Sequence, residues 1–160
     1  MATTRTRSEG TSTSAPVDPL ELERQVCFAL SVASRTVLNV YRPLLDPMGL
    51  THPQYLVMLA LWQHAPMSVK DVGELLQLDS GTLSPLLKRL ESSGLVTRTR
   101  DPQDERALTV SLTAQGRALR RQATRIPGQV VSRLGIDIAE LEDLHRALTR
   151  VIDAAVTATS

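Results

Sequence analysis

Cys27 is the only cysteine among the 160 residues of the chain, and its thiol could serve either redox chemistry or packing. A thiolate can attack the O–O bond of a peroxide and become a sulfenic acid, if its pKa is lowered and the oxidant has access. A free cysteine is also commonly a small buried hydrophobe. Because no second cysteine is present, a sulfenic acid here would react with a small cellular thiol or a backbone amide, or be oxidised further. The residues alone leave packing and redox chemistry open.

The three histidines are the other side chains that could hold a metal ion. They show no ligand spacing with one another or with Cys27, and the sequence contains no C-x-x-C motif. We therefore expect structural or surface roles for His64 and His145, with His52 the exception taken up below, and neither a metal nor a cofactor.

Small polar and basic side chains gather in "DSGTLSPLLKR" and around "DPQDER". Hydroxyl groups at a helix N-terminus can approach bases and phosphates, and basic groups farther along a helix suit phosphates. An arginine at a hairpin tip suits the minor groove of DNA. The acidic neighbours are also consistent with solvated arginines that do not contact DNA. The net charge of +1 is small, so any basic surface must be local. The candidate DNA contacts are Ser80, Gly81, Thr82, Ser84, Lys88, Arg89, Arg98, Asp104 and Arg106.

Helical periodicity and capping signals predict the elements that would position these residues. A first helix is predicted from an Asp18 cap to a stop or kink near Pro43. A second begins after Thr51, and its apolar run "YLVMLALWQ" predicts burial. A short third helix is capped by Ser68, and a fourth covers 80–93 and stops at Gly94.

The segments on either side of "DPQDER" have strand character. "LVTRTR" and "ALTVSL" are rich in Thr and Val, and the second alternates apolar and polar residues. A β-hairpin directly after a helix-turn-helix predicts a winged helix. The fold class is therefore mainly α with a small β-hairpin wing.

Two closing helices are predicted, one from Thr113 with an interruption at Pro127-Gly128 and one from an Asp137 cap. Together with the first helix they carry apolar stripes outside the winged part, so we expect a second copy of the chain to cover them. The expected organisation is a disordered tail at 1–17 and a single domain at 18–157. In that domain, 18–45 and 113–157 would dimerise and 51–112 would bind DNA.

No apolar run approaches the roughly 20 residues of a membrane span, and the N-terminus lacks the apolar stretch of a signal peptide. With a single cysteine, this predicts a cytoplasmic protein that does not bind membranes.

The segment from "LDSGTLSPLLKRLESSGLVTRTR" to "LTAQG" closely resembles the recognition helix and wing of the MarR-type regulators. Asp104 and Arg106 form the D-x-R of their wing, and Leu112, Thr113 and Gly116 form the following L-T-x-x-G. The resemblance implies that Asp104 orients Arg106 toward DNA.

More narrowly, "LERQVCFALSVASR" and "YRPLLDPMGLTHPQYLVMLALW" are similar to the organic hydroperoxide-sensing repressors of that family. In that subclass tyrosine hydroxyls hold a reactive cysteine, which implies a redox role for Cys27, with Tyr41 acting across a dimer. Two further positions that carry tyrosine in the subclass are Ser31 and His52 here. We expect His52 to supply the missing donor, and a positive charge if it is protonated.

The leading hypothesis is a homodimeric repressor that binds a pseudo-palindromic double-stranded operator. Organic hydroperoxide would oxidise Cys27 and release it from DNA, with a low-molecular-weight thiol trapping the sulfenic acid. An alternative is a MarR-type regulator that responds to a small apolar or phenolic ligand. A thiol peroxidase is disfavoured, since turnover would require a resolving thiol and the recognition helix would be unexplained. We do not expect an enzyme.

Overall fold

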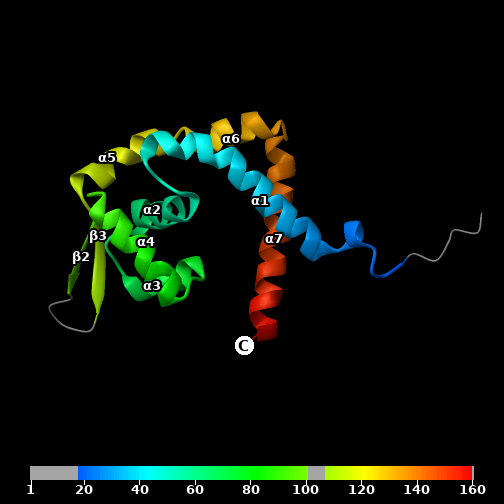
Figure 1. Ribbon diagram of the computed structural model, residues 1–160, viewed down its shortest axis with the longest axis horizontal. Helices are drawn as coiled ribbons and strands as arrows, with labels where there is room; N and C mark the ends of the chain where they lie inside the picture. Colours follow the sequence, from blue (N-terminus) through cyan, green and yellow to red (C-terminus); the bar gives the residue numbers. More distant parts are fainter. Residues whose placement is uncertain (1–17, 101–106, 160) are drawn as a thin grey trace, which may run out of the picture. The chain divides into compact units, whose positions relative to one another are not determined.

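The computed structural model describes residues 18–100 and 107–159 (Figure 1). The chain divides into two units, Met1–Arg35 and Thr36–Ser160, and the boundary lies inside helix α1. The tail predicted at 1–17 lies outside the described residues.

The first unit contains the 3-10 helix η1 (Leu22–Arg24) and the beginning of α1 (Val26–Leu45). The prediction that the first helix starts after Asp18 is therefore wrong. The Asp18 carboxylate accepts a hydrogen bond from the Leu20 N–H at 2.9 Å, which forms a local turn instead of a helix cap. The Gln25 side-chain amide donates to the Pro19 carbonyl at 2.8 Å and stabilises this irregular segment. Helix α1 ends two residues after Pro43, close to the predicted position.

The second unit begins with the rest of α1 and continues through a winged helix-turn-helix. Most of its helices begin at the predicted caps. Thr51 and Gln54 form a capping box, and the Ser68 side chain accepts the N–H of Asp71. Asp79, which was not predicted as a cap, accepts the N–H of Thr82. The elements are η2 (Asp46–Met48), α2 (His52–His64), β1 (Met67–Ser68), α3 (Val69–Leu76), α4 (Ser80–Ser92), β2 (Val96–Arg100), β3 (Leu108–Leu112), α5 (Ala114–Ala123), α6 (Ile126–Leu134) and α7 (Ile138–Thr159).

The predicted hairpin is present as β2 and β3, which pair antiparallel with Val96 opposite Leu112 and Arg98 opposite Val110. A third strand, β1, pairs with the other edge of β3 and was not predicted. It contains only two residues, too few for a period-two pattern to show in the sequence.

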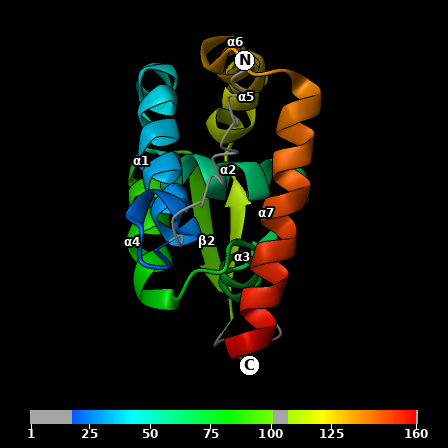
Figure 2. The same cartoon turned by 90° about the vertical axis from the view of Figure 1, so that its right-hand side faces the viewer.

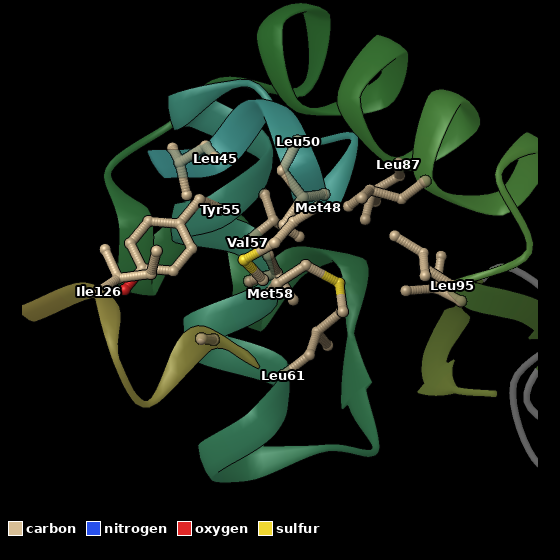
Figure 3. Close-up of a cluster of buried hydrophobic side chains, with 14 of the residues drawn as sticks. Leu45, Met48, Leu50, Tyr55, Val57, Met58, Leu61, Leu87, Leu95 and Ile126 are labelled. Carbon is tan, nitrogen blue, oxygen red and sulfur yellow. The ribbon is translucent and has the colours of Figure 1, made fainter. Parts of the chain in front are cut away.

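The core of this unit is aliphatic and lies between α2, α4 and the sheet (Figure 3). Tyr55 is the buried exception, with 4% of its surface exposed, and in Figure 3 it lies on the same side of the core as Ile126 and Leu45. The largest fully buried side chains are Leu45, Met58, Leu61, Leu83, Leu87, Leu90, Val57, Val72, Val96 and Val110.

The end of the chain forms three helices where two were predicted. The break falls at Thr124 and Arg125, and Pro127 lies in the first turn of α6. Proline is well suited to a first turn because the N–H it lacks has no partner there. Pro127-Gly128 therefore begins a helix and does not interrupt one.

Helix α7 stands apart from the winged part in Figure 1, and Figure 2 shows its full length. Along Ile138–Thr159 no residue is buried, and Ile138, Leu144 and Ile152 are 61%, 50% and 47% exposed. Among residues 18–100 and 107–159, no helix has both the length and the hydropathy needed to cross a membrane.

Candidate DNA-binding and thiol sites

Helix α4 turns an apolar face inward and a polar face outward. Leu83, Leu87 and Leu90 are buried in the core. All six predicted DNA contacts on this helix are exposed, so the winged part presents them together on one surface. They are Ser80, Gly81, Thr82, Ser84, Lys88 and Arg89.

The N-terminus of α4 is organised by Asp79. Its carboxylate accepts the Thr82 N–H at 2.8 Å and the Thr82 hydroxyl at 2.9 Å, and these bonds lower the pKa of Asp79. A Cβ added at Gly81 would lie 3.0 Å from a carboxylate oxygen of Asp79. The glycine therefore leaves room for the cap, a role that sequence reasoning did not assign to it.

Arg98 is engaged within the protein. Its Nη2 and Nε atoms lie 2.7 and 3.0 Å from Oε2 of Glu91, and its backbone N–H donates to Oε1 at 3.2 Å. The side chains of Arg98 and Glu91 are 24% and 38% exposed. These bonds tie the first strand of the wing to the last turns of α4. A DNA contact by Arg98 stays a prediction, and Asp104 and Arg106 lie outside the described residues.

The Glu91–Arg98 pair should make wing attachment sensitive to acid. The hydrogen bonds from Arg98 lower the pKa of Glu91 below its ordinary 4.5. A carboxyl group whose pKa is depressed by folding contributes stability above its ordinary pKa, and that stability is lost as pH falls through the folded value. We therefore expect the free energy of unfolding, measured in urea, to fall more between pH 6 and pH 3 for the wild type than for Glu91→Gln.

Glu74→Gln is the matched control for this experiment. Oε1 of Glu74 lies 3.6 Å from Nζ of Lys70, but both side chains are largely exposed. Neutralising Glu74 should therefore change the free energy of unfolding little. If the free energies of unfolding of the wild type and Glu91→Gln change in parallel with pH, the pair does not attach the wing.

Cys27 is exposed in this single chain and lies in the first turn of α1. The Ser31 hydroxyl, one turn later, donates to the Cys27 carbonyl oxygen at 2.8 Å. Such bonds to the carbonyl four residues earlier are usual for serine in helices. The Ser31 hydroxyl is thus bonded to the backbone of Cys27, and its predicted part in redox sensing stays a prediction.

Tyr41, His52 and Tyr55 form an aromatic cluster. The ring centroids of Tyr41 and His52 lie 5.0 Å apart in an edge-on arrangement, and the ring of Tyr55 lies 6.1 Å from Tyr41 and 6.4 Å from His52. Burial and the neighbouring Tyr41 raise the pKa of Tyr55. Tyr41 and His52, which were each predicted as partners of the Cys27 thiolate, therefore lie next to one another within one unit of the chain. Their contact with the thiol stays a prediction.

The half-buried position of His52 changes its expected chemistry. Burial lowers the pKa of His52 from 6.5, because a cation loses hydration there. A lowered pKa favours the neutral imidazole, so the positive charge that was expected only of a protonated His52 is disfavoured at this position. His52 also lines a pocket of about 290 Å³, with Leu38, Arg42, Asp46, Leu50, Thr51 and Pro53.

Sequence reasoning assigned no role to Trp62. Its ring centroid lies 6.4 Å from that of Tyr55, and its indole N–H donates to the Gly116 carbonyl oxygen at 2.8 Å. The two partners are 54 residues apart, so no local pattern could have revealed the bond. Tyr55 and Trp62 also line a second pocket of about 430 Å³, together with Leu59, Gln63, Arg120, Ala123, Thr124 and Pro127.

A short helix, a tight turn, an exposed polar helix and an antiparallel hairpin define a winged helix-turn-helix, a class of DNA-binding domain. The profile of the MarR family matches residues 50–108. The chain is 47% identical over 129 residues to the organic hydroperoxide resistance transcriptional regulator of Bacillus subtilis (strain 168), covering 81% of this chain and 86% of that protein. It is 38% identical over 131 residues to the HTH-type transcriptional regulator SarZ of Staphylococcus aureus (strain NCTC 8325 / PS 47), covering 82% and 88%. The chain belongs to the MarR family and is a transcriptional regulator.

Solved structures agree with this assignment. Reduced AbfR bound to DNA superposes with a TM-score of 0.76 at 32% identity, covering 88% of this chain and 96% of AbfR. The PcaV regulator of Streptomyces coelicolor, in complex with its natural ligand, gives 0.73 at 29% identity, covering 89% and 99%.

Proposed function

We propose that this regulator is a homodimeric repressor that leaves its operator when an organic hydroperoxide oxidises Cys27. The similarity to the hydroperoxide resistance regulator of Bacillus subtilis carries the proposal. Two features of the chain support it: the exposed thiol on α1 and the Tyr41–His52 pair beside a pocket.

The proposed reaction consumes one peroxide for each thiolate. The Cys27 sulfur attacks the O–O bond, a sulfur–oxygen bond forms, and the leaving alkoxide takes a proton and departs as an alcohol. The sulfenic acid then condenses with a low-molecular-weight thiol, forming a mixed disulfide and releasing water. By resemblance to the subclass, Tyr41 and His52 of a second copy would donate hydrogen bonds that stabilise the thiolate.

A dimer is supported by the exposed apolar side chains on the two long helices. Leu30 and Leu38 of α1 are 38% and 37% exposed, and those of α7 are more exposed still. Obligate interfaces are large and apolar, so a second copy would bury these groups. Two recognition helices would then meet half-sites about one helical turn apart on a pseudo-palindromic operator.

The two basic contacts to DNA should behave differently. Lys88→Ala should weaken binding to all sequences alike and reduce the slope of log affinity against log salt by about one, because one phosphate contact is lost. Arg106→Ala should cost about 1–3 kcal/mol and relax the preference for A·T pairs under the wing. Fluorescence anisotropy with a duplex selected from a random library measures both effects.

Arg133→Ala removes one positive charge from the exposed surface of α6 and serves as the control. An unchanged salt slope for Lys88→Ala, or wild-type affinity for Arg106→Ala, would contradict the assignment of these contacts.

A ligand-responsive regulator is the second candidate function, and the pocket beside Tyr55 and Trp62 favours it. Its volume lies in the range of small-molecule sites, and it combines aromatic faces with the Arg120 guanidinium. PcaV was solved with its natural ligand, and CouR of Rhodococcus jostii RHA1 with p-coumaroyl-CoA, at 29% and 28% identity.

A release experiment separates the two functions. The reduced protein is bound to its selected duplex and titrated with cumene hydroperoxide or with a phenolic carboxylate. We expect release by the peroxide only, and reversal by dithiothreitol. Release by the carboxylate alone would overturn the redox function in favour of the second candidate.

A further inference from the structure

We propose that Trp62 is a positioning residue that transmits the state of the thiol site to the wing. This inference rests on the proposed function, since it names the route by which oxidation reaches the DNA-binding surface. Trp62 joins two groups of contacts whose residues are far apart in the sequence.

The first group is a line of rings that begins with Tyr41 near the end of α1 and continues along α2. The 5.0 Å contact of Tyr41 with His52 continues through Tyr55 to Trp62, each step having ring centroids within 6.4 Å. Tyr55 is buried and Trp62 is half-buried. A displacement of the Tyr41–His52 pair would therefore move these packed rings as well. Close-packed interiors transmit strain.

The second group lies where the recognition helix meets the wing. The indole N–H of Trp62 donates to the Gly116 carbonyl oxygen at 2.8 Å. Gly116 packs so closely on Leu95 that a Cβ added at Gly116 would lie 2.0 Å from the Leu95 carbonyl oxygen. Thr113 donates its hydroxyl to the Gly94 carbonyl at 2.6 Å and accepts the Gly116 N–H at 2.9 Å. Gly94 and Leu95 connect the end of α4 to β2.

Trp62 is the member common to both groups. Its ring contacts Tyr55, and its N–H reaches the start of α5, which is bonded to the α4–β2 junction. A change at the thiol site that moves Tyr41 or His52 would therefore shift the wing relative to the core through one hydrogen bond.

The first test is a double-mutant cycle on DNA affinity, measured with the reduced protein so that it does not depend on redox chemistry. The four proteins are the wild type, His52→Ala, Trp62→Phe and the double variant. His64→Ala changes an exposed side chain on α2 and is the control for a neighbouring change. Independent sites are additive within about twofold, whereas coupled sites are not. We expect non-additivity of about fivefold, and additivity within twofold would overturn the inference.

The second test separates transmission from thiol chemistry. Cys27 oxidation is followed by thiol titration with cumene hydroperoxide, and DNA affinity is measured before and after. Trp62→Phe should oxidise at the wild-type rate but show about a tenfold smaller loss of affinity. A slower oxidation rate, or a full loss of affinity, would overturn the positioning role.

A third measurement uses the intact protein, in which Trp62 is the only tryptophan. Oxidation of Cys27 should change its emission, and Cys27→Ser should show no change. An unchanged emission in a wild-type protein that still releases DNA would refute the route through Trp62. A wild type that never releases DNA on oxidation would instead refute the proposed function, and the cycle above would still decide the inference.

Discussion

We expect Cys27→Ser to bind the selected duplex with wild-type affinity and to show no response to organic hydroperoxide. The substitution replaces sulfur with oxygen in an exposed side chain of α1, so the fold and the exposed polar face of α4 should be unaffected. Serine cannot form the sulfenic acid, so the displacement that oxidation causes cannot occur. In the wild type, oxidation should lower DNA affinity more than a hundredfold, which corresponds to about 3 kcal/mol.

The measurement is a binding titration of each protein with and without cumene hydroperoxide. Tyr41→Phe and His52→Ala serve as graded comparisons, since they remove donors and leave the thiol. Both should slow the response without abolishing DNA binding. If Cys27→Ser still releases DNA on peroxide treatment, the cysteine is a packing residue, and the ligand-responsive function takes first place.

Gly116→Ala should be strongly destabilising. The added Cβ would lie 2.0 Å from the Leu95 carbonyl oxygen and 3.0 Å from its carbon, which are backbone atoms that cannot turn aside. It would also disturb the peptide groups that bond Trp62 and Thr113. Overpacking of a well-packed site typically costs about 1–3 kcal/mol, and a backbone clash should reach at least the upper end of that range.

Gly128→Ala is the matched control. Gly128 lies inside α6 with nothing within 4 Å of the position of an added Cβ. Alanine should therefore stabilise the helix by about 0.5–1 kcal/mol. Urea unfolding at one protein concentration compares the two variants, because the stability of a dimer depends on concentration. Equal stabilities for Gly116→Ala and the wild type would contradict the close packing of α5 on the wing.

Elements whose limits depend on neighbouring residues were predictable from the chain alone. The Thr51–Gln54 box, the Ser68 cap and the Thr113 cap are hydrogen bonds across three residues, so the signals for them lie within a few neighbouring positions of the sequence. The hairpin strands were predicted for the same reason, since alternation is visible within five residues. The exposed polar face of α4 also follows from helical periodicity.

Features that depend on distant contacts could not be predicted in this way. The start of α1 was misplaced because Asp18 forms a local turn in competition with a cap, and the two-residue strand β1 exists only because β3 pairs with it. Arg98 was assigned to DNA, and only the packed wing shows that Glu91 engages it.

The same distinction between local and long-range features holds for the candidate thiol site. The identities of Cys27, Tyr41 and His52 were available from the sequence and its resemblance to a family. The lowered pKa of His52 was not, because burial results from packing. Nor was the bond between Trp62 and Gly116, which joins residues 54 apart. Local hydrogen bonding and periodicity are encoded within a few residues, whereas burial and long-range contacts are decided only when the whole chain packs.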